Sequence, residues 1–303
     1  MKRLVMDVDT GLDDMVAELI AFGSKEVQVD GIVATYGNKL IEHTLPNTLN
    51  VVRYLGRDVP VYEGSHRPLK REPVVGGNIH GADGMACFPF PHYQDNTSKG
   101  DGIAFLKQHV LEHPGQITVV ATGPLTDIAR VMQEEPAWKD SVGELVVMGG
   151  SLAGGNVTPY AEFNSFDDPE AADYVFRSGV RTILMPLDVT TQVTLDRQEL
   201  DKLKTFGGKA AKLFGHCMET YYQSCTSVVR ECPAMHDPCC IAYLLDPLMF
   251  SGSWKSLCCV TDRKSERYGE TVDTGKEGNT LVMLHADQSR FWPLVEQAVR
   301  NLA

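Results

Sequence analysis

The chain has 303 residues, 43% of them hydrophobic, which is enough to bury one large core. Its formal charge of −12 and the lack of any run rich in lysine or arginine argue against nucleic acid or an anionic membrane as its partner. A neutral or cationic small molecule is the ligand class that these numbers favour.

The first twenty residues and the cysteines indicate a compartment. Acidic residues interrupt the apolar segment that a signal peptide would need, and no apolar stretch reaches the roughly 18 residues of a membrane-spanning helix. The eight cysteines contain no Cys-x-x-Cys spacing, which favours buried thiols in a reducing compartment over disulfides. We therefore expect a cytoplasmic protein.

The first predicted strand, turn and helix carry four carboxylates within eight residues. Residues 4–6 are an apolar strand, and residues 15, 16, 19 and 20 are apolar at the spacing of one helix face. Four like charges so close together repel one another unless they stay fully solvated or hold a hard metal ion, and the end of a buried strand is poorly solvated. The cluster therefore favours a metal site, formed by Asp7, Asp9, Asp13 and Asp14.

Two other interpretations of this stretch remain. An EF-hand loop that begins at Asp7 would place Glu18 at position 12, but position 6 requires glycine and here is Leu12. The strand and its Asp7-x-Asp9 also resemble the nucleophile loop of haloacid dehalogenase-like phosphatases, in which the first aspartate is phosphorylated and the second transfers a proton. Such a phosphatase needs a phosphate-binding lysine in a later motif, and none can be placed convincingly.

Further strand and helix signals follow. Residues 27–35 predict a strand that ends at Tyr36-Gly37-Asn38, where the Gly-Asn pair also suits a plain turn. Residues 41–55 predict a helix, and residues 59–62 predict a short strand. Residues 64–102 are rich in Gly, Pro, His and Asp; within them, residues 78–85 have the glycine content of a lid, although a surface loop has the same composition.

The alternation of strand and helix continues to the C-terminus. Strands are expected at 117–121, 144–148 and 182–185, short strands within 256–284, and helices at 101–112, 125–134, 168–177, about 196–226 and 288–301. A further apolar helix starts at His236-Asp237-Pro238, where Asp237 also suits a helix N-cap. Such units predict an α/β fold with an open, mostly parallel (mixed) sheet, helices on both faces, and ligands at the carboxyl ends of the strands. We expect a single domain over residues 1–303.

Seven motifs in one order resemble the inosine-uridine preferring nucleoside hydrolase family over essentially the whole chain. They are Asp7-Val8-Asp9-Thr10-Gly11-Leu12-Asp13-Asp14, Tyr36-Gly37-Asn38, Ile79-His80-Gly81, Thr122-Gly123-Pro124-Leu125-Thr126, Val147-Met148-Gly149-Gly150, Asn156 through Ala161-Glu162-Phe163-Asn164 to Asp168-Pro169-Glu170-Ala171-Ala172, and His236-Asp237-Pro238.

The resemblance implies a Rossmann-like nucleoside hydrolase fold and a purine or pyrimidine ribonucleoside hydrolase of the inosine-uridine type, which releases ribose and a free nucleobase in nucleoside catabolism or salvage. It implies a homodimer or homotetramer. It also implies one Ca²⁺ held by Asp9, Asp14, Asp237 and the carbonyl of Thr122, with further waters completing the shell.

The resemblance assigns roles to the other motif residues. Asp9 takes a proton from the attacking water, beside Asn38, and His236 together with His80 protonates the departing base. The ribose site is formed by Asp13, Met148, Asn156, Glu162, Asn164 and Asp237. A ring of carboxylates would stabilise the positive charge that develops on ribose, and it would repel a 5′-phosphate. A calcium-dependent nucleoside binder without turnover would need the same contacts but could lack the base Asp9, which is present here.

The chain departs from the family pattern at three places. Thr10 replaces a common proline, a change expected to matter little, and Ala82-Asp83 replaces a usual Glu-Ser after the His-Gly pair. Before His236, Thr220 and Ser224 fall where some members place base-contacting tyrosines, with Tyr221 and Tyr222 beside them. The preferred nucleobase therefore stays open.

Overall fold

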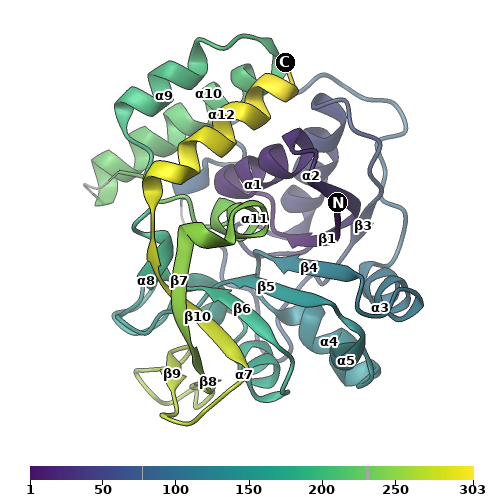
Figure 1. The fold of residues 1–303 in the computed structure, drawn as a ribbon, viewed down its shortest axis with the longest axis vertical. Coiled ribbons are helices and arrows are strands. Elements are labelled where there is room, and N and C mark those ends of the chain that lie inside the picture. Colours follow the sequence, from purple (N-terminus) through teal and green to yellow (C-terminus); the bar gives the residue numbers. More distant parts are fainter. Residues whose placement is uncertain (77, 230–231) are drawn as a thin grey trace.

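The computed structural model describes residues 1–76, 78–229 and 232–303. Its centre is an eight-stranded sheet in the order β3-β2-β1-β4-β5-β6-β10-β7, shown in Figure 1. Each neighbouring pair is parallel except β10 with β7. The strands are β1 (Lys2–Val8), β2 (Val27–Ala34), β3 (Val61–Glu63), β4 (Ile117–Ala121), β5 (Glu144–Met148), β6 (Thr182–Met185), β7 (Phe250–Lys255) and β10 (Thr280–Ala286). The predicted open, mostly parallel mixed sheet is confirmed.

Helices cover both faces of this sheet, as Figure 1 shows. One face carries α1 (Leu12–Gly23), α2 (Ile41–Tyr54), α10 (Gly208–Ser224), α11 (Pro238–Leu245) and α12 (Phe291–Asn301). The other carries α3 (Gly102–Glu112), α4 (Thr126–Glu134), α5 (Trp138–Ser141) and α7 (Pro169–Arg177). Because both faces are covered, the central strands are continuous apolar runs, and every residue of β4 and β6 is buried.

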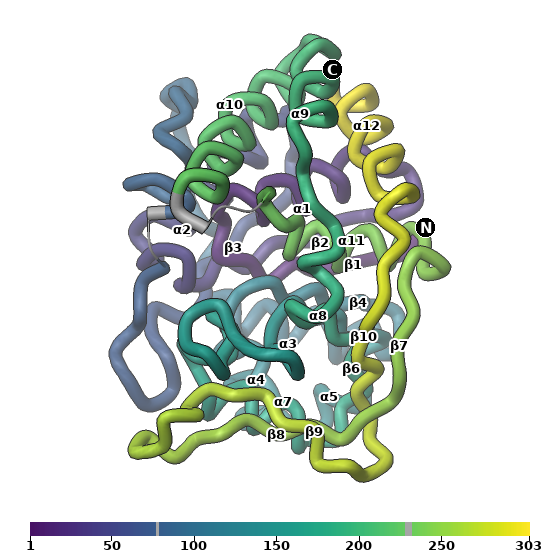
Figure 2. The backbone as a smooth tube through the Cα atoms, turned by 90° about the vertical axis from the view of Figure 1, so that its left-hand side faces the viewer, coloured from purple at the N-terminus to yellow at the C-terminus, as the bar shows by residue number. Residues whose placement is uncertain are grey.

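Two of the remaining parts lie at opposite ends of the molecule. The helix α9 (Arg197–Lys204) packs against α10, and both lie far from the two-stranded sheet of β8 (Leu257–Cys259) and β9 (Thr271–Asp273) in Figure 2. The short helical segments are α6 (Phe163–Asp167), α8 (Leu187–Thr190), η1 (Asn78–His80), η2 (Cys225–Val229), η3 (Pro247–Met249) and η4 (Gln288–Arg290). Among the described residues, no helix combines the length and the apolar character needed to cross a bilayer.

The strand register determines where polar side chains meet. Asp7 of β1 lies opposite Val33 of β2 and Ala121 of β4. The residues that follow these three strands therefore lie side by side at one edge of the sheet, and they include Asp9, Asn38 and Thr122. This is the carboxyl edge at which the sequence predicts the ligand.

The edge strand β7 was not expected from the sequence. Its residues 251–254 are exposed and read Ser-Gly-Ser-Trp, which has no alternation of apolar and polar residues. The strand β3 begins at Val61 rather than at residue 59, and Pro60 just before it has no N–H to donate to a ladder. The other predicted elements occur within a few residues of their expected ends.

Candidate active site

The acidic loop connects β1 to the N-terminus of α1. Gly11 is the residue before the helix, and its backbone N–H donates to Asp14 Oδ2 at 2.9 Å. Asp13 and Asp14 lie in the first turn, where the helix dipole favours negative charge. A side chain at Gly11 would lie 2.6 Å from Asn38 Nδ2 and 2.7 Å from His80 Nδ1, so glycine lets the neighbouring segments approach this loop.

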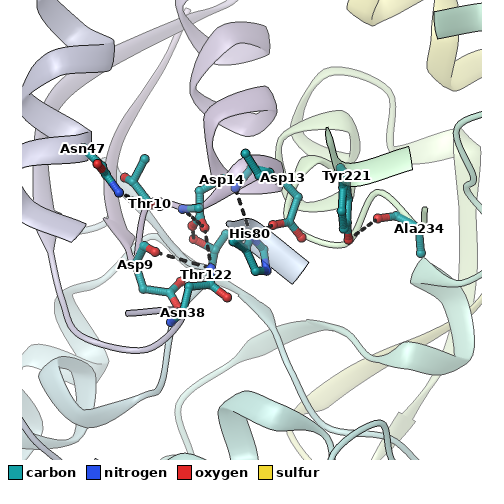
Figure 3. Close-up of polar contacts among 12 residues, drawn as sticks. Asp9, Thr10, Asp13, Asp14, Asn38, Asn47, His80, Thr122, Tyr221 and Ala234 are labelled. Atoms are coloured by element: carbon teal, nitrogen blue, oxygen red, sulfur yellow. Dashed lines mark hydrogen bonds and ion pairs between the residues drawn. The ribbon is translucent and has the colours of Figure 1, made fainter. Parts of the chain in front are cut away.

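Three carboxylates from two distant parts of the chain meet beside this loop. Asp237, which directly precedes α11, joins Asp13 and Asp14, and each of the three offers an oxygen within 4.8 Å of the others. All three side chains are buried, and Asp13 Oδ1 has no hydrogen-bond partner. Figure 3 shows Asp13 and Asp14 on the first turn of α1, above Thr122.

Asp9 lies on the other side of Asp14 and is held by Asn38. The backbone N–H of Asn38 donates to Asp9 Oδ2 at 2.6 Å, and its side-chain Nδ2 donates to Asp14 Oδ2 at 3.1 Å. A Cβ on Gly37 would lie only 2.1 Å from Asp9 Oδ2, so the Gly37-Asn38 pair is more than a surface turn. It lets the backbone approach a carboxylate closely enough to fix its orientation.

Thr122 and Asn164 connect the loop after β4 to the acidic cluster. Thr122 Oγ1 donates to Asp14 Oδ1 at 2.7 Å, and Asn164 Nδ2 donates to the Thr122 carbonyl at 2.7 Å. Asn164 Nδ2 also lies 3.3 Å from the Met148 carbonyl at the end of β5. Thr122 therefore contacts Asp14 through its hydroxyl, and its carbonyl, the predicted ligand, accepts a hydrogen bond from a buried amide.

Glu162 is the N-cap of α6 and is 2% exposed. Its two oxygens accept hydrogen bonds from the backbone N–H groups of Gly150, Asn164 and Ser165 at 2.7 to 3.1 Å. Asn156 Oδ1 accepts the N–H of Phe163 at 2.9 Å. These contacts fold residues 150–165 over the ends of the central strands.

His80 lies on η1, within the predicted lid. Its Nδ1 accepts the backbone N–H of Leu12 at 3.1 Å, so the neutral imidazole carries its proton on Nε2. Burial, followed by the nearby charges of Lys39 and His236, lowers the pKa of His80 to about 3. Its ring lies against that of Tyr221, with centroids 5.8 Å apart.

His236 lies opposite, directly before Asp237. Its Nδ1 shares a hydrogen bond of 2.8 Å with Thr190 Oγ1 of α8, and burial lowers the pKa of His236 to about 4. Tyr221 Oη donates to the carbonyl of Ala234 at 3.2 Å, so α10 supports the segment that carries His236 (Figure 3).

The carboxyl groups lack a compensating charge. Burial, followed by the charge of Asp14, raises the pKa of Asp13 to about 7 and that of Asp9 well above its usual value. Burial, followed by the charges of Asp13 and Asp14, raises the pKa of Asp237 well above its usual value. In the described part of the chain, no lysine or arginine forms an ion pair with these groups, and His80 Nδ1 lies 3.9 Å from Asp13 Oδ1. Buried, closely spaced hard oxygens of this kind fit Ca²⁺.

Every site residue that the family resemblance assigns, except Asp14, lines one cavity, whereas Asp7 of the predicted acidic cluster does not. Its volume is about 870 Å³, and its walls include the ribose and base candidates together with Tyr221 and Asp188. Asp14 is not in the wall itself but is bonded to Asn38 and Thr122, which are. The predicted residues in the wall are Asp9, Asp13, Asn38, His80, Thr122, Met148, Asn156, Glu162, Asn164, His236 and Asp237.

Sequence reasoning missed the support from β6 and α8. Asp188 accepts Ser151 Oγ at 3.1 Å and the N–H of Leu152 at 2.8 Å, and Thr190 orients His236. The sequence contained a signal for this support, because Asp188 and Thr190 follow the carboxyl end of β6, a parallel strand. Tyr221 lines the cavity, whereas the ring of Tyr222 lies under Arg197 at 5.9 Å.

Thr10 is more than a neutral replacement of proline. Its hydroxyl donates to Glu18 Oε1 at 2.7 Å and lies 2.6 Å from Thr48 Oγ1, and all three side chains are buried. Burial raises the pKa of Glu18 well above its usual value. This network joins the acidic loop to α1 and α2.

Comparison with known proteins gives a consistent assignment. A sequence model described as inosine-uridine preferring nucleoside hydrolase matches residues 4–293. The pyrimidine-specific ribonucleoside hydrolase RihB of Escherichia coli (strain SE11) is 34% identical over 306 residues, which cover 99% of this chain and 97% of that protein. The structure of a purine-preferring ribonucleoside hydrolase from Gardnerella vaginalis superposes with a TM-score of 0.94 at 28% identity, and that of a plant nucleoside hydrolase, PpNRh1, with 0.93 at 27%; each covers 99% of both chains.

We expect Ca²⁺ to raise the thermal stability of chelator-treated protein, because a cation relieves the repulsion among the buried carboxylates. A ligand at 100 times its Kd adds about 2.7 kcal/mol to the free energy of unfolding. Differential scanning calorimetry with and without Ca²⁺ measures this. D237N should lose the calcium-dependent rise in Tm, whereas D201N, at a surface position on α9, should retain it. An equal rise in both variants would place the ion elsewhere.

Proposed function

The chain belongs to the inosine-uridine preferring nucleoside hydrolase family and is an N-glycosyl hydrolase of ribonucleosides, and from this premise we propose that it is calcium-dependent and accepts nucleosides of the inosine-uridine type. The observation that supports this most is the buried cluster of Asp13, Asp14 and Asp237, with Thr122 bonded to Asp14 and with Asp9 in the wall of the same cavity. The proposed ligands are Asp9, Asp14, Asp237 and the Thr122 carbonyl. A bound Ca²⁺ would supply the charge that makes a neighbouring water more acidic.

We assign the general base to Asp9. The Asn38 N–H holds its Oδ2, and its carboxyl group faces the cavity. Burial and Asp14 raise the pKa of Asp9, and a cation nearby would lower it again. A carboxyl group whose pKa lies between the value raised by burial and the value lowered by a cation can take a proton from water near neutral pH.

We assign the ribose site to the carboxylates and amides around Asp13. Cleavage of the N-glycosidic bond leaves positive charge on ribose, which a ring of carboxylates stabilises. Glu162 uses three of about four acceptor positions on backbone N–H groups, so its charge is held rigidly and one position remains for a hydroxyl. Asn164, Asn156, Met148 and Asp237 complete the proposed contacts.

We assign protonation of the departing base to His236, with His80 as a second donor. Both imidazoles are neutral near pH 7, because burial lowers the pKa of each. Negative charge that develops on the base raises the proton affinity of an adjacent imidazole. His236 would therefore take up a proton from solvent and pass it to the base as the bond breaks, which returns the imidazole to its neutral form.

The phosphatase alternative has no support in the site. Asp7, its required nucleophile, is 1% exposed, does not line the cavity, and lies against Asp127. Burial and Asp127 raise the pKa of Asp7 well above its usual value, which disfavours a nucleophilic carboxylate. The names of the relatives report different bases, pyrimidine for one and purine for another, so the preferred base of this chain stays a prediction. Its cytoplasmic location and its assembly as a homo-oligomer also stay predictions.

We expect exhaustive removal of the metal to abolish ribose release, because the buried acids would then hold no cation. The test is a reducing-sugar assay over inosine, uridine, cytidine and adenosine, before and after chelation and after Ca²⁺ is restored, with metal content measured by elemental analysis. Full activity in verified metal-free protein would refute calcium dependence.

We expect Asp9→Ala to lower kcat by at least the roughly 10²–10⁴-fold typical of a lost general base. Asp7→Asn is the matched control, since an amide can still hydrogen-bond to Asp127 and Asp7 does not line the cavity. The measurement is steady-state kinetics with inosine and uridine. Phosphate release from phosphomonoesters that depends on Asp7, with no ribose release from nucleosides, would support the phosphatase instead.

We expect His236→Ala to slow hydrolysis of inosine or uridine by about 10²–10⁴-fold, the range for general-acid help. A 4-nitrophenyl riboside leaves as a stable phenolate and needs no proton, so its hydrolysis should change little. Comparing kcat/KM on the two substrates separates the roles. Equal losses on both would show that His236 only positions its neighbour Asp237.

A further inference from the structure

The segment of residues 79–88, called here the lid segment, is docked rather than free. It contacts the acidic loop through His80 Nδ1, which accepts the N–H of Leu12. It contacts α10 through the Ala86 carbonyl, which lies 2.9 Å from His216 Nε2. The lid segment therefore bridges the proposed metal loop and the helix that carries Tyr221.

One buried side chain joins the lid segment to the acidic loop a second time. Asn47, on α2, is 7% exposed, and its Nδ2 donates to the carbonyl of Thr10 at 3.2 Å and to that of Asp83 at 2.9 Å. A primary amide has two N–H donors, and both are used here on carbonyls from separate segments. Thr10 directly follows the proposed base Asp9.

The lid segment needs such an anchor because its backbone is costly to form. Ala86 and Cys87 have φ values of 53° and 50°, a region that residues other than glycine rarely adopt. Asp83 Oδ1 holds this turn by accepting the N–H groups of Met85 and Cys87 at 2.9 and 3.0 Å. Asn47 binds the carbonyl of the same Asp83, so it fastens the turn as one unit.

We propose that Asn47 is a positioning residue that clamps the lid segment to the acidic loop and thereby places His80 at the cavity. The inference rests on the proposed function for its catalytic consequence, since His80 is a donor to the departing base there. Its structural part, the clamp, stands on the hydrogen bonds of Asn47 alone.

The same substitution at two positions of α2 tests the clamp. Asn47→Asp removes both donors and sets a carboxylate against two carbonyls. Asn50→Asp is the matched control, because Asn50 uses its Oδ1 to accept a hydrogen bond from Asn96 Nδ2 at 3.0 Å and an aspartate keeps that acceptor. Should N47D fail to fold, N47A removes the donors without adding charge and takes its place in each assay.

Two measurements on the metal-loaded enzyme are needed. Hydrogen exchange of peptides covering the lid segment should be at least about tenfold faster in N47D than in wild type, and unchanged in N50D. In N47D, kcat/KM for inosine or uridine should fall by about 10- to 100-fold, as when a catalytic group is misplaced by about 1 Å. The loss on 4-nitrophenyl riboside should be several times smaller, because that substrate does not use His80.

Unchanged exchange in N47D would overturn the clamp, and equal losses on both substrates would show that Asn47 does not act through His80. If wild-type enzyme released ribose from none of the nucleosides, the proposed function would fail, while the exchange measurement would still decide the clamp.

Discussion

The site depends on the burial of four like charges close together, near the carboxyl end of β1. Asp9, Asp13, Asp14 and Asp237 are each at most 5% exposed, and no described lysine or arginine pairs with them. Burial and mutual repulsion work against such a cluster, so the surrounding structure must supply what stabilises it. It does so with the N-terminus of α1, the Asn38 amides, the Thr122 hydroxyl and, as we propose, a calcium ion.

The rest of the cavity follows from the same constraint. Positive charge on ribose suits a ring of carboxylates, whereas a departing base needs a proton that carboxylates beside a metal cannot easily provide. Both imidazoles line the same cavity, and each is oriented through Nδ1, by Leu12 or by Thr190. His80 lies beside Asp13 and His236 directly precedes Asp237, so the groups that serve the base lie next to the groups that favour a cation. The two histidines come in on η1 and on the segment before α11.

A second acid pair shows that burial of a carboxyl group does not by itself make a site. Asp7 and Asp127 face each other under the sheet edge, and burial raises the pKa of each. Asp127 Oδ1 accepts the N–H of Ser65 at 2.9 Å, so this pair links β1, α4 and the loop after β3. Neither side chain lines the cavity. Asp7, inside β1, therefore has a structural position, whereas Asp9, just after the strand, lies in the cavity wall.

The sequence by itself determined the sheet class, most helix and strand positions, and eleven of the residues in the cavity wall, because strand ends, helix starts and the seven motifs are local patterns. It did not determine β7, whose Ser-Gly-Ser-Trp run is a strand only because β10 pairs with it. It also could not determine what residues 78–85 contact, or whether Tyr221 or Tyr222 lines the cavity. Those answers depend on contacts across 36 residues, from Asn47 to Asp83, and across 141, from His80 to Tyr221. Only the folded chain brings such distant groups within hydrogen-bond or ring contact, so the tertiary structure alone decided them.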